Sequence, residues 1–136
     1  MKRFFMWLVL VGAVICFVGV FWQAFSIVAY VRSGSEDWLD AHGAGSMPVH
    51  LGQLMIVVGA IVAAWANWRA VGAAIAFLVL SVVQLFFIGD TDKDGSWVNG
   101  FHGLLALVIL LAALAYADWA ARRLGLRRVS GAAGSA

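Results

Sequence analysis

Residues 4–31 read FFMWLVLVGAVICFVGVFWQAFSIVAYV, without one Asp, Glu, Lys or Arg. The hydrocarbon core of a bilayer takes about 20 apolar helical residues to cross, so this stretch is long enough to span it. Three further apolar stretches follow at 48–66, 70–88 and 97–120. None of them alternates apolar and polar residues with a period of two, so the pattern favours membrane helices over the strands of a barrel.

The overall composition excludes a soluble globular enzyme. The chain has 136 residues, of which 64% are hydrophobic and 12% are charged. A soluble domain is usually about half apolar and about a quarter charged, so this chain has too few charges to cover a surface that faces water. A disordered chain is excluded by the same hydrophobicity. A disulfide scaffold is excluded as well, because the single Cys cannot form an internal disulfide. An enzymatic role inside the membrane stays open.

The basic residues predict the orientation of the spans. With the N-terminus in the cytoplasm, two cationic residues, Arg32 and Lys93, fall outside. The other seven fall inside, and they are Lys2, Arg3, Arg69, Arg122, Arg123, Arg127 and Arg128. The positive-inside rule therefore favours two cytoplasmic termini. We expect an all-α integral membrane protein of the bacterial inner membrane, an antiparallel four-helix bundle with up-down-up-down order. The basic pI reflects this topology, and no nucleic-acid partner is expected.

The connections between the spans predict one domain. Residues 1–123 are expected to form a single four-helix transmembrane domain, and residues 124–136 a flexible cytoplasmic tail. Residues 32–47 and 89–96 are rich in Gly, Ser and acidic residues, which is typical of loops. His42 is therefore expected in a solvated outer loop. The inner turn at 67–69 is so short that the second and third spans must be antiparallel neighbours.

Polar residues inside the spans are the best pointers to function, because burying them in lipid is costly. His50 lies about three residues into its span and His102 about six, so their depths differ by about 4.5 Å. Each half of the chain consists of an apolar helix, an acidic loop with Trp and a helix that opens with His, so His50 and His102 are expected to be equivalent. The intramembrane polar residues all fall toward the outer half: Gln23, Ser26, His50, Gln53, Ser81, Gln84, Asn99 and His102.

Two imidazoles on diagonal helices of a bundle can hold one haem between them. At 8–10 Å between neighbouring helices, the diagonal measures roughly 12–14 Å. The leading hypothesis is an electron-transfer protein with one haem b bound by His50 and His102 near the outer leaflet. Three glutamines are expected beside the cofactor or a quinone: Gln23, Gln53 and Gln84. Small residues that would admit the macrocycle are Gly52, Gly59, Gly100, Gly103 and Ala106.

Other interpretations of these residues remain open. The histidines can bond with Gln53 and Gln84, and the small residues can serve helix packing. His42 can join the two span histidines in a zinc or copper site on the outer side. The chain can also be a non-catalytic accessory or assembly subunit of a larger membrane complex, or form a homo-oligomer in the lipid bilayer.

The second outer loop contains half of a calcium-binding pattern. Asp90, Asp92, Asp94 and Gly95 match D-x-D-x-D-G, in which alternate carboxylates converge on one ion. Position 12 of that pattern is Phe101 rather than the bidentate Glu. The loop therefore predicts either a weak calcium site or a solvated acidic turn.

The chain resembles small bacterial four-helix membrane proteins of unknown function. The resemblance rests on His50-Leu51-Gly52, on Gln84 and on Phe101-His102-Gly103, and it covers residues 1–123. Such proteins are similar to the four-helix halves of b-type cytochromes and haem A synthase-like proteins, so the resemblance implies haem binding. The chain departs from the pattern in its D-x-D-x-D-G loop and in the Gly, rather than Ala, that follows His102.

Overall fold

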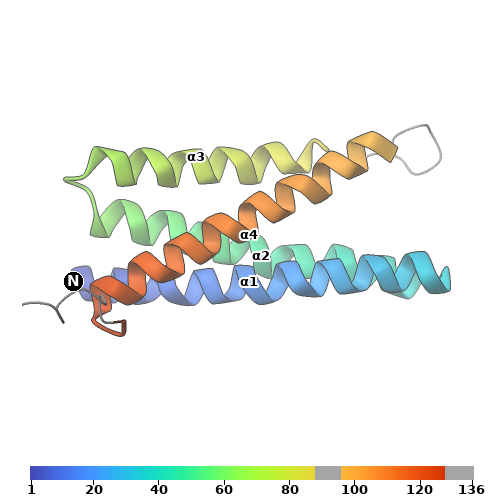
Figure 1. Ribbon diagram of the computed structural model, residues 1–136, viewed down its shortest axis with the longest axis horizontal. Helices are drawn as coiled ribbons and strands as arrows, with labels where there is room; N and C mark the ends of the chain where they lie inside the picture. Colours follow the sequence, from blue (N-terminus) through green and yellow to red (C-terminus); the bar gives the residue numbers. More distant parts are fainter. Residues whose placement is uncertain (88–95, 128–136) are drawn as a thin grey trace, which may run out of the picture.

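The computed structural model describes residues 1–87 and 96–127. These residues form four helices and no strand: α1 (Lys2–Ser33), α2 (Glu36–Ala63), α3 (Trp68–Leu85) and α4 (Ser96–Leu124) (Figure 1). All four are long and apolar enough to cross a membrane, which confirms the predicted all-α class with four candidate spans. The predicted calcium ligands Asp90, Asp92 and Asp94 lie outside the described residues, as does most of the predicted tail.

Consecutive helices run in opposite directions (Figure 1). The N-terminus, the α2–α3 turn and the end of α4 therefore share one end of the bundle, called the basic end below for its Lys and Arg side chains. The α1–α2 turn and the start of α4 share the opposite end, called the histidine end because the three histidines lie toward it. Helix α4 runs obliquely, beside α3 at the histidine end and beside α1 at the basic end (Figure 1).

Helices α1 and α2 form the tightest packing in the molecule, through glycines that leave no room for a side chain. A Cβ atom on Gly52 would lie 2.6 Å from the carbonyl oxygen of Gly12 and 2.9 Å from Cys16 Sγ. A Cβ atom on Gly59 would lie 2.8 Å from the carbonyl oxygen of Phe5. Small residues let membrane helices approach closely, because dispersion rather than hydrophobic burial drives their association. Gly52 and Gly59 therefore serve helix packing, and the prediction that they admit a macrocycle is wrong.

Helix α2 starts earlier than the sequence predicts. Residues 32–47 were expected as a loop, yet the helix begins at Glu36 and passes through Pro48. Packing against α1 explains the difference: Gly45 fits against the Trp22 ring, and Trp22 Nε1 donates to the carbonyl oxygen of Ala41 at 3.2 Å. These contacts override the loop preference of the Gly- and Ser-rich composition.

The second hairpin, α3 and α4, is packed much more loosely than the first. The buried core draws most of its residues from the first hairpin, among them Val9 and Cys16 of α1 and Ile56 of α2, and α3 and α4 add a smaller number, among them Phe77 and Ile109. The diagonal helices α1 and α3 make no contact within the described residues, and α2 touches α4 only slightly. The molecule therefore consists of two hairpins joined mainly through α1 with α4 and α2 with α3.

Candidate functional site

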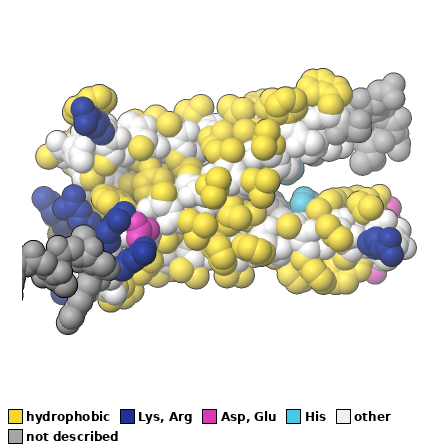
Figure 2. All heavy atoms as spheres, in the orientation of Figure 1, with side chains coloured by type: hydrophobic (Ala, Val, Ile, Leu, Met, Phe, Trp, Pro, Cys, Tyr) yellow, Lys and Arg dark blue, Asp and Glu magenta, His cyan; other side chains and the backbone are white. Residues whose placement is uncertain are grey.

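A cavity of about 130 Å³ lies between the two hairpins at the histidine end. All three histidines of the chain contribute to its wall. Figure 2 shows the two hairpins separating at this end, with histidine side chains at the base of the gap. The residues that line the cavity are Gln23, His42, Gly43, Ser46, Val49, His50, Gln84, Leu85 and His102.

His42 is fixed by α1. Its Nδ1 lies 2.9 Å from the backbone carbonyl oxygen of Gln23, and Gln23 Nε2 donates in return to the carbonyl oxygen of His42 at 3.5 Å. The buried hydroxyl of Ser26 lies 3.4 Å from the same Nδ1 and also donates to the Gln23 carbonyl. His42 is thus a half-buried helical residue with a defined ring position. The prediction that it is a solvated loop residue is wrong.

His102 is held in the same manner by α3. Its Nδ1 lies 3.2 Å from the backbone carbonyl oxygen of Gln84, and Gln84 Nε2 lies 3.4 Å from the carbonyl oxygen of His102. The sequence predicted a contact between a glutamine and this histidine. In the structure, the side chain of each residue bonds to the backbone carbonyl oxygen of the other. Gln84 is buried and His102 is half-buried.

These contacts determine which nitrogen of each ring can act as a ligand. A backbone carbonyl oxygen only accepts hydrogen bonds, so Nδ1 of His42 and of His102 must carry the proton. In the neutral imidazole the lone pair is then on Nε2. Histidines that bind metals almost always donate their other ring N–H to an oxygen in this way, which fixes tautomer and ring orientation. Two such rings line one cavity, one from each hairpin.

His50 has a different partner. Its Nδ1 lies 2.8 Å from Oε1 of Gln53, one turn further along the same helix. The amide Nε2 of Gln53 is buried without a hydrogen-bond partner among the described residues. Among the described residues, the His50 ring is supported only from within α2, whereas each of the other two rings is bonded to a neighbouring helix. The predicted contact between His50 and Gln53 is confirmed.

The two hairpins repeat each other, with a different correspondence from the predicted one. A shift of 61 positions (84 minus 23) places Gln23 on Gln84, and a shift of 60 (102 minus 42) places His42 on His102. The same shifts superpose buried positions: Ala13 and Ala74, Cys16 and Phe77, Val20 and Ser81, Val49 and Ile109, Ala60 and Ala120. His102 is equivalent to His42, so the predicted equivalence with His50 is wrong.

Sequence reasoning missed this pair for a specific reason. The segment around His42 is Gly-rich and has the composition of a loop, whereas the segment around His102 has the composition of a helix, so the two histidines do not look equivalent in the sequence. The signal that could have found it is the spacing from Gln to His, 19 residues in the first hairpin and 18 in the second. The repeat of that spacing is visible without any structure.

The remaining predicted features contribute less to the site. Among residues 1–87 and 96–127, no three His, Cys, Asp or Glu side chains lie close enough together to hold one metal ion. The three-histidine zinc or copper site thus gains no support. Gly100 and Gly103 have open space where a side chain would stand, and Asn99 is exposed. Comparison with protein families, curated proteins and solved structures finds no match for this chain.

Proposed function

We propose that this protein binds one haem b between its two hairpins and transfers electrons within the membrane. The observation that carries the proposal is the pair of reciprocal Gln–His contacts, which leaves an Nε2 lone pair on His42 and on His102 at the wall of one cavity. The axial ligands we propose are therefore His42 and His102. This assignment revises the one drawn from the sequence, which paired His102 with His50.

The donor chemistry fits a haem iron. Neutral imidazoles ligate haem iron, and the hydrogen bond on the opposite ring nitrogen tunes the ligand. The described residues that line the cavity carry no acidic or basic side chain apart from the histidines. His50 lies eight residues beyond His42 along α2, about 12 Å by helical rise, so the repeat places it below the level of the proposed ligand pair. When bound, haem would supply reversible one-electron chemistry at its iron.

The size of the cavity sets a condition on this proposal. Pockets for ligands of drug size measure about 300–1,000 Å³, against about 130 Å³ here. A macrocycle therefore requires the hairpins to move apart at the histidine end. Helices α2 and α4, which carry the two proposed ligands, touch only slightly, so moving these two helices apart breaks few direct contacts between them.

We further propose that the bundle spans a bacterial inner membrane with both termini in the cytoplasm. Glu36, Asp37 and Asp40 lie at the start of α2, at the histidine end, while most of the described Lys and Arg residues lie at the basic end. Figure 2 shows Lys and Arg side chains gathered at that end. The positive-inside rule then puts the haem site near the outer leaflet.

Three single variants test the ligand assignment. The purified protein, expressed with added haem precursor, is expected to show a Soret band with sharp α and β bands after reduction by dithionite. His42→Ala and His102→Ala are each expected to abolish these bands, while His50→Ala retains them. Loss in His50→Ala with retention in His42→Ala would restore the pair drawn from the sequence. Retention in all three variants would refute ligation by histidine.

A further inference from the structure

A second cavity lies at the basic end, far from the histidines. Its volume is about 480 Å³, within the range of ordinary ligand pockets. It is enclosed by the first turns of α1, the α2–α3 turn and the last turns of α4. The lining residues are Lys2, Arg3, Met6, Ala63, Ala64, Ala66, Asn67, Trp119, Arg123 and Leu124.

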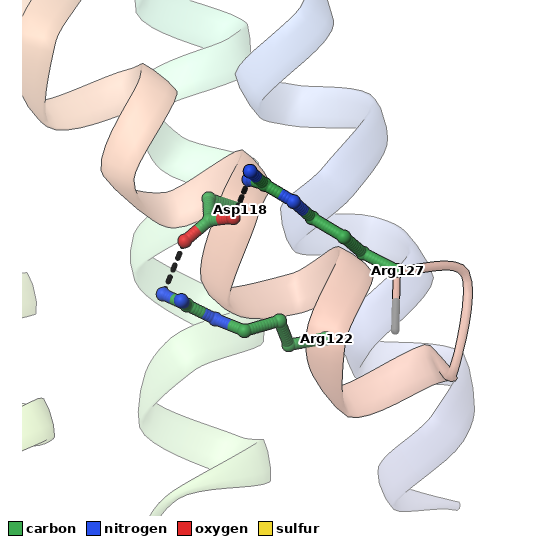
Figure 3. Close-up of polar contacts among 3 residues, drawn as sticks. All are labelled: Asp118, Arg122 and Arg127. Carbon is green, nitrogen blue, oxygen red and sulfur yellow. Dashed lines mark hydrogen bonds and ion pairs between the residues drawn. The ribbon is translucent and has the colours of Figure 1, made fainter. Parts of the chain in front are cut away.

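Three cations face this cavity, and no described residue supplies them with a counter-ion. Lys2, Arg3 and Arg123 line it, and none of the described lining residues is acidic. Among residues 1–87 and 96–127, the acidic residue at this end is Asp118, and it is already engaged: Arg122 and Arg127 bind its two carboxylate oxygens (Figure 3). Within the described part of the chain these are the ion pairs of the basic end, so the cavity cations remain uncompensated.

The rest of the lining suits a phospholipid. Asn67 accepts a hydrogen bond from the Ala70 backbone through Oδ1 at 3.4 Å, which leaves its amide N–H groups free to donate to an anion. The apolar residues of the lining, Met6, Trp119 and Leu124 among them, offer contact to a glycerol backbone and the first acyl carbons. Basic pockets between membrane helices on the cytoplasmic side bind acidic lipid headgroups.

We propose that this cavity is a binding site for the phosphate headgroup of an anionic phospholipid from the adjoining leaflet. Lys2, Arg3 and Arg123 hold the phosphate oxygens, and Asn67 donates a hydrogen bond. The site is independent of the haem proposal, because it lies at the opposite end of the bundle and shares no residue with the histidine cavity.

Native mass spectrometry of the delipidated full chain in detergent tests the site. Phosphatidylglycerol and cardiolipin are each titrated against phosphatidylcholine, whose zwitterionic headgroup has no net charge. Each cation near a headgroup strengthens binding about fivefold, so Lys2→Gln with Arg3→Gln is expected to weaken binding of the anionic lipids about 25-fold. Arg123→Gln alone is expected to weaken it about fivefold.

The matched control removes the same charge from the same end. Arg69→Gln with Arg127→Gln leaves the cavity lining intact and leaves Asp118 bound to Arg122, so anionic lipid affinity is expected to fall less than twofold. Circular dichroism confirms that both double variants fold. Equal losses in the two double variants, or equal binding of phosphatidylcholine, would overturn the proposal. Displacement of the lipids by millimolar inorganic phosphate would overturn the assignment to lipid in favour of a free anion.

Discussion

The close approach of α1 to α2 makes a sharp prediction for Gly52→Ala. The added methyl carbon would lie 2.6 Å from the Gly12 carbonyl oxygen and 3.1 Å from the Cys16 backbone nitrogen. Both atoms belong to the main chain of α1, so no side-chain rotation relieves the clash. A carbon atom approaches a carbonyl oxygen to about 3.3 Å, so α1 must retreat by about 0.7 Å.

The cost of that retreat follows from packing energetics. Overpacking a core costs about 1–3 kcal/mol. A gap of 0.5–1 Å also forfeits about a quarter to a half of each dispersion contact along the interface. We therefore expect Gly52→Ala to lower the free energy of unfolding by about 1–2 kcal/mol, because a clash near the top of the overpacking range is partly offset by the roughly 1 kcal/mol by which Ala is favoured over Gly inside a helix.

Gly72→Ala is the matched control. Gly72 lies inside α3, and nothing lies within 4 Å of the position of its added methyl group. Ala is favoured over Gly in a helix interior by about 1 kcal/mol, so this variant is expected to gain stability. The assay is unfolding by sodium dodecyl sulfate in mixed micelles, followed by circular dichroism. The packing argument would be refuted if Gly52→Ala were as stable as the parent protein, or at least as stable as Gly72→Ala.

Three further predictions concern polar groups and orientation. Gln23→Ala and Gln84→Ala are each expected to lower the free energy of unfolding by about 0.6 kcal/mol in the same assay, because they remove equivalent interhelical bonds. Costs that differ by more than about 1 kcal/mol would contradict the repeat. Gln53→Leu is expected to raise stability by about 1 kcal/mol, because relief of its unpaired buried amide outweighs the lost bond to His50, and a destabilised variant would contradict this reasoning. An impermeant maleimide is expected to label Ser33→Cys but not Ala66→Cys in intact cells, because these exposed residues lie at opposite ends of the bundle and the native Cys16 is buried. The reverse labelling pattern would contradict the proposed topology.

Hydrophobic patterning was sufficient to predict the helices. The uncharged run at 4–31 and the three further apolar stretches are each long enough to span a bilayer as a helix. The number of helices and their type therefore follow directly from the sequence. The sequence also predicted that the polar residues lie at a similar depth, and Gln23, Gln84 and His102 line one cavity in the structure.

Tertiary contacts decided what the sequence could not. Residues 36–47 have the composition of a loop, and only the fit of Gly45 against Trp22 reveals why they are helical. That error concealed His42, and with it the correspondence between the hairpins. The role of Gly52 was equally ambiguous, because a small residue suits a macrocycle and a close helix contact alike, and only the position of Gly12 distinguishes them.

The haem content of the purified wild-type protein tests the central claim most directly. The protein is expressed with adequate haem supply, and the pyridine haemochrome is measured against protein concentration, together with the oxidised and the dithionite-reduced spectra. The proposed pair of ligands, His42 and His102, predicts one haem b per chain with the sharp α and β bands of a low-spin iron on reduction. A colourless protein under these conditions would contradict haem binding and the electron-transfer function built on it.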